Sequence, residues 1–185
     1  MTGFLVLLLI AVPIGVAVWL YNSLVGLRNR VGSAWAQIDV QLKRRHDLIP
    51  NLVAAVRGYM QHERELFDRI AAARTRALSA SGAEAVGAAE GALTQAVGGL
   101  LAVMERYPDL KANQNVLALQ EELVTTENRV GFARQLYNDL VARYNTRQQI
   151  FPANLVAGAL GFTPAEFFQV DAVDRELPRI VLGTR

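Results

Sequence analysis

The feature that most constrains this chain is an uncharged apolar segment near its first residue. Gly3 to Tyr21 is almost entirely apolar, and the first charged side chain is Arg28. Nineteen helical residues rise about 28 Å, close to the ~30 Å hydrocarbon core of a bilayer. Trp19 and Tyr21 end the segment, where amphipathic rings favour the headgroup region. We therefore predict that residues 1–22 form a transmembrane anchor.

A cleaved signal peptide is the main alternative to a retained anchor. Such a peptide normally carries a positively charged start and a small-residue cleavage site. Met1-Thr2-Gly3 has no charged side chain, and no A-x-A pattern follows. The chain has no cysteine, which excludes a lipid anchor on a thiol, disulfides and thiol nucleophiles. These features favour the retained span.

The flanking charges predict the orientation of the anchor. Asp39 is the single acid between Asn22 and Arg45. Five basic residues lie in the same stretch: Arg28, Arg30, Lys43, Arg44 and Arg45. An excess of Lys and Arg marks the cytoplasmic flank of a span. We expect a single-pass membrane protein, with the N-terminus outside and the body, residues 23–185, in the cytoplasm as one domain.

Apolar spacing predicts that the body is all-α. From Leu24 to Ile70 apolar residues recur at three- and four-residue steps, the spacing of one helical face. Pro50 interrupts this stripe, because proline removes a backbone donor and crowds the preceding turn. The favoured interpretation is one long helix kinked at Pro50, in which Pro50→Ala would be mild. The alternative is a second helix that begins just after Asp47.

A second helix is predicted over residues 83–106. It follows a break at residues 78–82, and Ser81 and Glu84 have the spacing of a capping box. Residues 80–103 contain eight alanines and five glycines, and each interior glycine costs about 0.5–1 kcal/mol relative to alanine. Close backbone approach to a neighbouring helix and local mobility are both open explanations.

Tyr107-Pro108-Asp109 ends that helix, and a long amphipathic helix is predicted over residues 111–149. Asparagines recur along it and are expected to cap or to hydrogen-bond across the bundle: Asn113, Asn115, Asn128, Asn138 and Asn145. Together, the first helix and this long helix predict the fold. It is an N-terminal transmembrane helix that continues into an elongated antiparallel helical bundle, with coiled-coil-like packing.

The last part of the chain changes character. Residues 153–162 form a short charge-free segment, and Thr163-Pro164-Ala165-Glu166 has the composition of a helix start. The favoured interpretation is a helix that caps the end of the bundle. An interfacial element or a partner-docking patch is the alternative, because exposed apolar patches usually have a use.

Candidate reactive residues are few. His46 and His62 would lie about 160° apart on a straight helix, so they do not share a face for a metal. The following carboxylates alternate with arginines, as on solvent-exposed faces: Glu105, Glu121, Glu122, Glu127 and Asp139. No phosphate loop, dinucleotide fingerprint or nucleophile elbow is present. We predict no catalytic, cofactor-binding or metal-binding residue, and no enzyme.

Long sequence blocks resemble the LemA family. They are Tyr21–Val31, Ala34–Val53, Tyr107–Asn115, Thr126–Val130, Ala133-Arg134, Tyr137-Asn138 and Phe151–Asn154. The resemblance covers nearly the whole chain from about residue 20. It implies a bacterial single-pass membrane protein with a helical-bundle body, and it implies no reaction, because the molecular function of the family is undetermined.

Two classes of function follow. The favoured one is a membrane-anchored scaffold or adaptor that binds the bilayer, membrane-protein partners or copies of itself, and no nucleic acid, since the net charge is only +2. Ala11 and Gly15 form a small-x-x-x-small pair that permits self-association, which Gly15→Leu would test. The alternative is a membrane-bound enzyme whose polar site gathers the following residues with Asn or Tyr of the long helix: Arg28, Asn29, Arg44, Arg45, His46 and Asp47.

Overall fold

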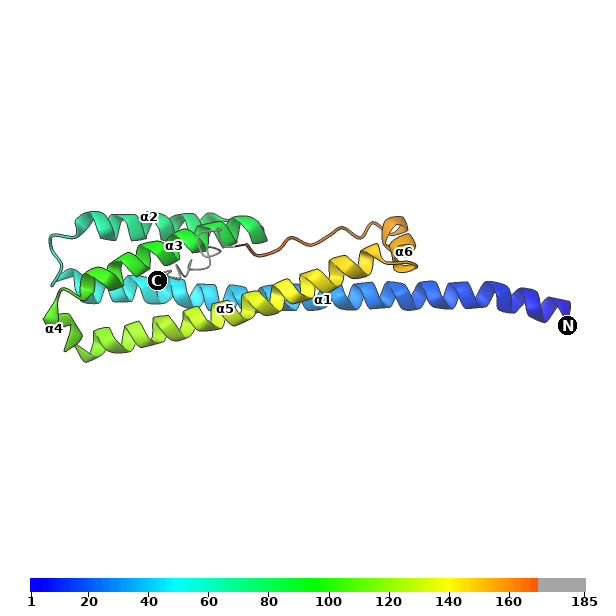
Figure 1. Cartoon of the computed structure of the whole chain (residues 1–185), viewed down its shortest axis with the longest axis horizontal. Coiled ribbons are helices and arrows are strands. Elements are labelled where there is room, and N and C mark those ends of the chain that lie inside the picture. The colour runs from blue at the N-terminus through cyan, green and yellow to red at the C-terminus, as the bar shows by residue number, and fades with distance from the viewer. Residues whose placement is uncertain (170–185) are drawn as a thin grey trace, which may run out of the picture. The chain divides into compact units, whose positions relative to one another are not determined.

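The computed structural model describes residues 1–169, and every regular element in that range is a helix. The helices are α1 (Thr2–Arg57), α2 (Arg64–Ser79), α3 (Ala83–Met104), α4 (Pro108–Lys111), α5 (Gln114–Gln149) and α6 (Ala153–Ala159) (Figure 1). The predicted all-α bundle is confirmed. The last ten residues, the only stretch with strand-like alternation, lie outside the described range.

The chain forms two compact units, which are described separately. Unit 1 comprises Met1–Arg45 and Leu123–Phe167, and unit 2 comprises His46–Glu122 together with Phe168 and Gln169 of the described residues. Both boundaries inside the long helices fall between consecutive helical residues. The predicted division at residue 22 concerns the membrane boundary, and it stays a prediction.

Pro50 lies inside α1, and the residues on both sides of it are helical. The prediction of one helix through Pro50 is therefore confirmed. The helix was also expected to continue along this stripe to Ile70, and this was wrong, because α1 ends at Arg57 and α2 starts at Arg64. Met60, in the turn between them, is fully buried. The apolar spacing continues through the turn because it reflects which side chains are buried, and a buried side chain can lie in a turn as well as in a helix.

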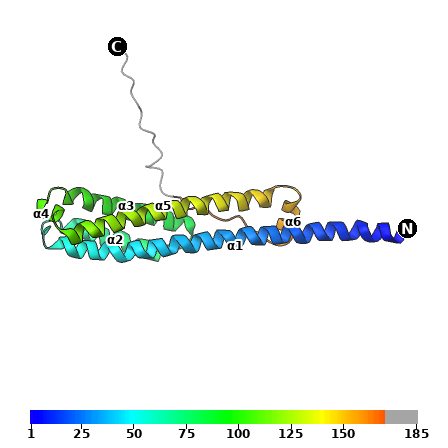
Figure 2. The same ribbon diagram turned by 90° about the horizontal axis from the view of Figure 1, so that it is seen from below.

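In unit 1, α1 and α5 run antiparallel. Three contacts fix their direction, because rising numbers on α1 meet falling numbers on α5. They are Trp19 with Arg147, Trp35 with Tyr137, whose ring centroids are 5.4 Å apart, and Arg45 with Glu127. The helix α6 then lies beside α1, as both views show (Figures 1 and 2). This places the charge-free segment next to the apolar end of α1.

The first part of α1 is exposed in unit 1. Every described side chain from Met1 to Trp19 is exposed, and Leu20 is the first buried one. Two described helices, α1 and α3, are long and apolar enough to cross a membrane by length and composition, and the apolar window of α1 is the less buried. The exposed apolar helix supports a membrane location.

In unit 2, α2 packs against α3. The residue before α3 is Gly82, with φ of 86°, a left-handed conformation that glycine adopts readily. No side chain hydrogen-bonds the cap of this helix. The predicted capping box of Ser81 and Glu84 was therefore wrong, because the positive-φ glycine, and not a serine, occupies the N-cap position.

Close backbone approach explains one of the α3 glycines. A Cβ at Gly87 would collide with the backbone of Gln169, which runs over this position. At Gly98 nothing lies within 4 Å of such an atom, and at Gly99 only the Leu66 side chain lies near it, at 3.7 Å. The segment that approaches Gly87 is therefore the non-helical chain at Gln169, whereas a neighbouring helix was expected.

The long helix α5 begins three residues later than expected, at Gln114. The single turn α4 precedes it. Asn113 caps α5, because its Oδ1 accepts hydrogen bonds from the backbone N–H of Asn115, at 3.0 Å, and Val116, at 3.3 Å. The expectation that an asparagine caps this helix is confirmed.

The predicted helix start at Thr163 was wrong, because residues 163–169 are not helical. Asn145 binds both backbone groups of Ala165: its Nδ2 donates to the carbonyl and its Oδ1 accepts from the N–H, each at 2.9 Å. The Tyr137 hydroxyl donates to the Glu166 carbonyl at 2.9 Å. These hydrogen bonds use backbone carbonyls that would otherwise bond within a helix. The tertiary contacts therefore outweigh the local preference of residues 163–166 for a helix start.

Candidate docking groove between α1 and α5

The polar residues of the proposed enzyme site do not come together. His46 is buried, and its Nε2 lies 2.6 Å from Oε1 of Glu90 on α3. Asp47 and Arg44 are exposed. Successive helical residues point about 100° apart, so the side chains of these neighbours diverge. The structure therefore assigns His46 to a buried pair in unit 2.

Glu90 is the residue that the sequence reasoning missed. It is one of two charged residues in α3 and is almost fully buried there. Its position continues the buried stripe Ala83, Val86, Leu93 and Val97. A carboxyl group on such a stripe needs a hydrogen-bonding partner. The position of Glu90 in the sequence could therefore have indicated a buried polar pair. Arg74 also donates from Nε to the His46 carbonyl, at 2.9 Å.

The other candidate residues, Arg28, Asn29, Arg45 and His62, lie in different surroundings. Arg28 and Asn29 are exposed on α1. Arg45 is buried in unit 1 and pairs with Glu127 on α5, with Nη2 and Oε2 3.1 Å apart. His62 is exposed in the turn before α2. Among residues 1–169 no three His, Asp or Glu side chains gather as a metal site.

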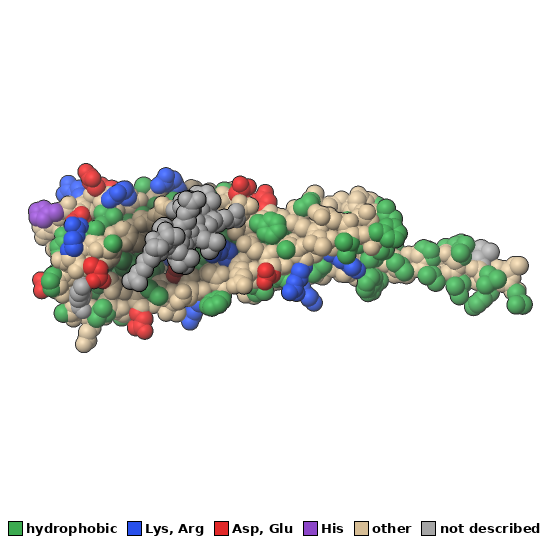
Figure 3. Space-filling model, in the orientation of Figure 1, with side chains coloured by type: hydrophobic (Ala, Val, Ile, Leu, Met, Phe, Trp, Pro, Cys, Tyr) green, Lys and Arg blue, Asp and Glu red, His purple; other side chains and the backbone are tan. Residues whose placement is uncertain are grey.

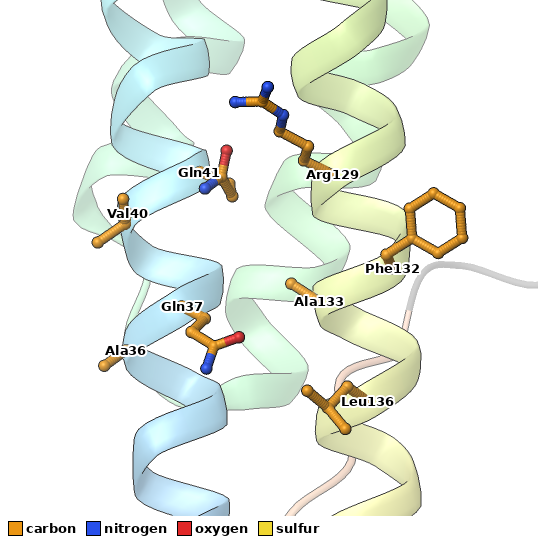
Figure 4. A pocket seen from close by; sticks show the side chains of 8 residues that line it. All are labelled: Ala36, Gln37, Val40, Gln41, Arg129, Phe132, Ala133 and Leu136. Carbon is orange, nitrogen blue, oxygen red and sulfur yellow. The ribbon is translucent and has the colours of Figure 1, made fainter.

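A groove of about 490 Å³ opens between α1 and α5 in unit 1. Four of the eight residues that line it come from each helix: Ala36, Gln37, Val40, Gln41, Arg129, Phe132, Ala133 and Leu136 (Figure 4). Gln37, Ala133 and Leu136 project between the helices, whereas Val40 and Phe132 flank the groove on its outer sides (Figure 4). A groove between two antiparallel helices suits a third helix.

The rims of this groove are strongly apolar and open to solvent. Phe132 is 73% exposed and Val40 is 63% exposed, and Leu136 is also exposed. The buried residues of α5 in unit 1 include Val130, Tyr137 and Val141, so Phe132 lies off the face that packs against α1. An aromatic side chain outside the core stripe was the available sequence signal, and it went unused.

Two polar side chains in the groove could bind a docked segment. The Oε1 atom of Gln41 is buried and accepts no hydrogen bond from any residue in the described part of the chain. Arg129 extends its guanidinium from α5 toward α1 (Figure 4). A buried acceptor needs a donor, and an arginine in an apolar groove favours a carboxylate. The groove therefore suits an apolar surface that carries an acid and a hydrogen-bond donor.

Two tyrosines of α5, Tyr137 and Tyr144, are buried in unit 1. Burial raises the pKa of Tyr137, and the nearby Glu166 carboxylate raises it further. Burial also raises the pKa of Tyr144, while Arg28 opposes the shift. Both phenols are therefore neutral at physiological pH and act as packing and hydrogen-bonding groups. The groove presents binding chemistry and offers no nucleophile beside a base.

Comparison with known proteins supplies a family. A LemA family profile matches residues 34–181. Magnetosome protein MamQ 2 of Paramagnetospirillum magneticum (strain AMB-1) is 26% identical over 80% of this chain and 64% of its own length. Magnetosome protein MamQ of Magnetospirillum gryphiswaldense is 23% identical over the same shares. Protein LemA of Metamycoplasma hominis is 25% identical over 93% of this chain and 81% of its own length. The chain thus spans 64% of the length of these MamQ relatives.

Proposed function

This chain belongs to the LemA family, and from that premise we propose that it is a membrane-anchored helical scaffold without enzymatic activity. The exposed apolar start of α1 would hold it in the bilayer, and the groove between α1 and α5 would bind a helix. The observation that carries the proposal is the exposure of Phe132 and Val40 on the rims of that groove. Large exposed apolar residues that cluster mark interaction sites.

The first occupant to test is a second copy of the chain. Anchored copies share one surface, so their effective concentration is high and weak contacts count for more. A symmetric pair would place the same rim of each copy against the other. Arg129 would then need a carboxylate from the facing copy, and α5 carries exposed acids such as Asp139 in unit 1.

The absence of cysteine makes this test direct. Phe132→Cys, as the only thiol, should give disulfide-linked dimers in native membranes under mild oxidation. Ser79→Cys is a matched control, because Ser79 is exposed in unit 2 and is close to cysteine in size. In detergent, Phe132→Glu should weaken self-association about 10- to 100-fold, as loss of an interface aromatic does.

Monomeric Phe132→Cys, with no adduct to any protein, would refute the groove as a docking site. Adducts with another membrane protein would keep the scaffold and replace the second copy as occupant. The membrane orientation has its own test: in intact spheroplasts, external protease should leave the body undigested. Digestion of the body from outside would reverse the proposed topology and leave the anchor in place.

The enzyme alternative has less support. The names of the matched relatives mention no reaction. His46 is held in a buried pair with Glu90, while Asp47 points to solvent. No observation favours a reaction at these residues, and the scaffold is the function that the geometry supports best.

A further inference from the structure

A second apolar groove lies in unit 1, where α6 returns to α1. It encloses about 610 Å³. All seven residues that line it are apolar or aromatic: Ala17, Val18, Tyr21, Leu155, Val156, Ala159 and Leu160. A site of this volume is large enough for a drug-sized ligand or for part of a lipid chain. Its lining offers apolar contact almost exclusively.

The chain around α6 is unusually free of charge. No Asp, Glu, Lys or Arg occurs between Arg147 and Glu166. Phe151, Leu155 and Leu160 are exposed within this stretch. On the face shown in Figure 3, hydrophobic side chains gather around this end of the body and continue along the projecting helix, which shows no charged side chain. Exposed apolar surface of this kind needs a partner or a membrane.

The groove is continuous with the predicted transmembrane segment. Val18 and Tyr21 belong to the last turns of the apolar stretch of α1, and they line the groove together with α6. The rings of Tyr21 and Phe162 meet edge to face, with centroids 5.9 Å apart. A bilayer that surrounds residues 3–21 therefore reaches the level of α6.

A cation contacts Trp19, the residue that follows Val18 of the groove lining. The guanidinium of Arg147 lies over the ring of Trp19, with its Cζ 5.2 Å from the ring centroid. The Nε of Arg147 is buried and has no acceptor among residues 1–169. An arginine at the boundary of an apolar helix is well placed to bind a lipid phosphate, which it can hold bidentately.

We propose that this groove binds a phospholipid of the surrounding bilayer, with an acyl chain between α1 and α6 and the phosphate on Arg147. The segment 148–165 then lies in the interfacial layer of the leaflet from which α1 emerges. This inference rests on the membrane anchor of the proposed function, and it is independent of the groove between α1 and α5.

The test uses the full chain in nanodiscs that contain phosphatidylcholine and phosphatidylglycerol. Leu160→p-benzoylphenylalanine should crosslink to lipid on illumination, with the adducts identified by mass spectrometry. Phe132→p-benzoylphenylalanine is the control, because Phe132 is also an exposed apolar residue of unit 1. It should give no lipid adduct. Circular dichroism would check that each variant keeps its helical content.

A second variant tests the phosphate site. Arg147→Gln should lower the preference of the Leu160 probe for phosphatidylglycerol by about fivefold, the effect of one cation near an anionic surface. Arg143→Gln is the control, because Arg143 is an exposed arginine one turn earlier in α5. Equal effects of the two variants would show a general surface charge and refute the Arg147 site.

The outcomes separate this inference from the anchor. Protein adducts, or no adduct, at residue 160 in a chain that resists carbonate extraction would overturn the lipid site and leave the anchor intact. A chain that carbonate releases from the bilayer would refute the anchor of the proposed function. Lipid adducts at residue 160 alone, weakened by Arg147→Gln, would support the site.

Discussion

Arg45 and His46 are consecutive residues of α1, and the two units satisfy these buried side chains in different ways. In unit 1, Arg45 pairs with Glu127, whose side chain is 44% exposed. In unit 2, His46 pairs with Glu90, and both side chains are buried. Water can reach the first pair through its acid, while the second depends wholly on protein partners. We therefore expect that loss of the acidic partner destabilises the protein little at Arg45 and strongly at His46.

The largest effect is expected from Glu90→Ala. It removes the buried partner of His46 and leaves a cavity, which should lower the free energy of unfolding by about 3 kcal/mol. Urea unfolding in detergent, followed by circular dichroism, measures this. Glu90→Gln retains an acceptor at Oε1 and should lose about 1 kcal/mol. Equal losses for the two variants would mean that the carboxylate itself stabilises this site, and that neither the packing nor the neutral acceptor that glutamine retains contributes.

Gly87→Ala tests close packing in unit 2. The new Cβ collides with the Gln169 backbone, and relief of such overpacking should cost about 1–3 kcal/mol. Gly98→Ala in the same helix enters open space and should stabilise the protein by about 0.5–1 kcal/mol. Thermal unfolding of the pair gives the contrast. Stabilisation by both alanines would show that residue 169 does not pack closely on α3.

Tyr137→Phe tests a polar contact in unit 1. Loss of the hydrogen bond to the Glu166 carbonyl should cost about 1 kcal/mol. Because burial and Glu166 raise the Tyr137 pKa above 10, its contribution is complete below about pH 10 and is lost as pH rises through the folded-state pKa. Melting temperatures measured on either side of about pH 10 should fall less for Tyr137→Phe. An unchanged alkaline slope would assign the loss to other groups, such as Tyr144.

The smallest effect is expected from Glu127→Ala. Water can replace its half-exposed carboxylate, so the loss should be about 1 kcal/mol or less and should shrink in high salt. Urea unfolding at low and high ionic strength provides the measurement. A loss as large as that of Glu90→Ala would remove the distinction between the two pairs.

Periodicity predicted the elements of this fold well, and it failed where tertiary contacts compete. The stripe through Pro50 gave a continuous helix, because the sum of apolar contacts outweighs one lost backbone bond. The same stripe missed the turn at Met60, since a buried side chain satisfies the pattern in a turn as well. At Thr163 the helix signal was local, and hydrogen bonds from Asn145 and Tyr137, to residues 20 and 29 positions away, outweighed it.

The candidate sites were less predictable for a related reason. Glu90 could have been recognised as a charge on an apolar stripe, but its partner His46 is 44 residues distant in sequence. Phe132 could have been recognised as an aromatic outside the core stripe. The groove that it borders depends on which face of α1 lies opposite, and spacing along one helix carries no such information.

The two hydrogen bonds between the Asn145 side chain and the Ala165 backbone predict which of these positions can vary among homologous chains. The amide of Asn145 binds only main-chain atoms at position 165, and every residue except proline offers the same two groups. Homologous chains can therefore vary at residue 165 while keeping this connection, whereas the residue at position 145 must supply both a donor and an acceptor. Selection should act strongly on the asparagine and weakly on the alanine that it holds.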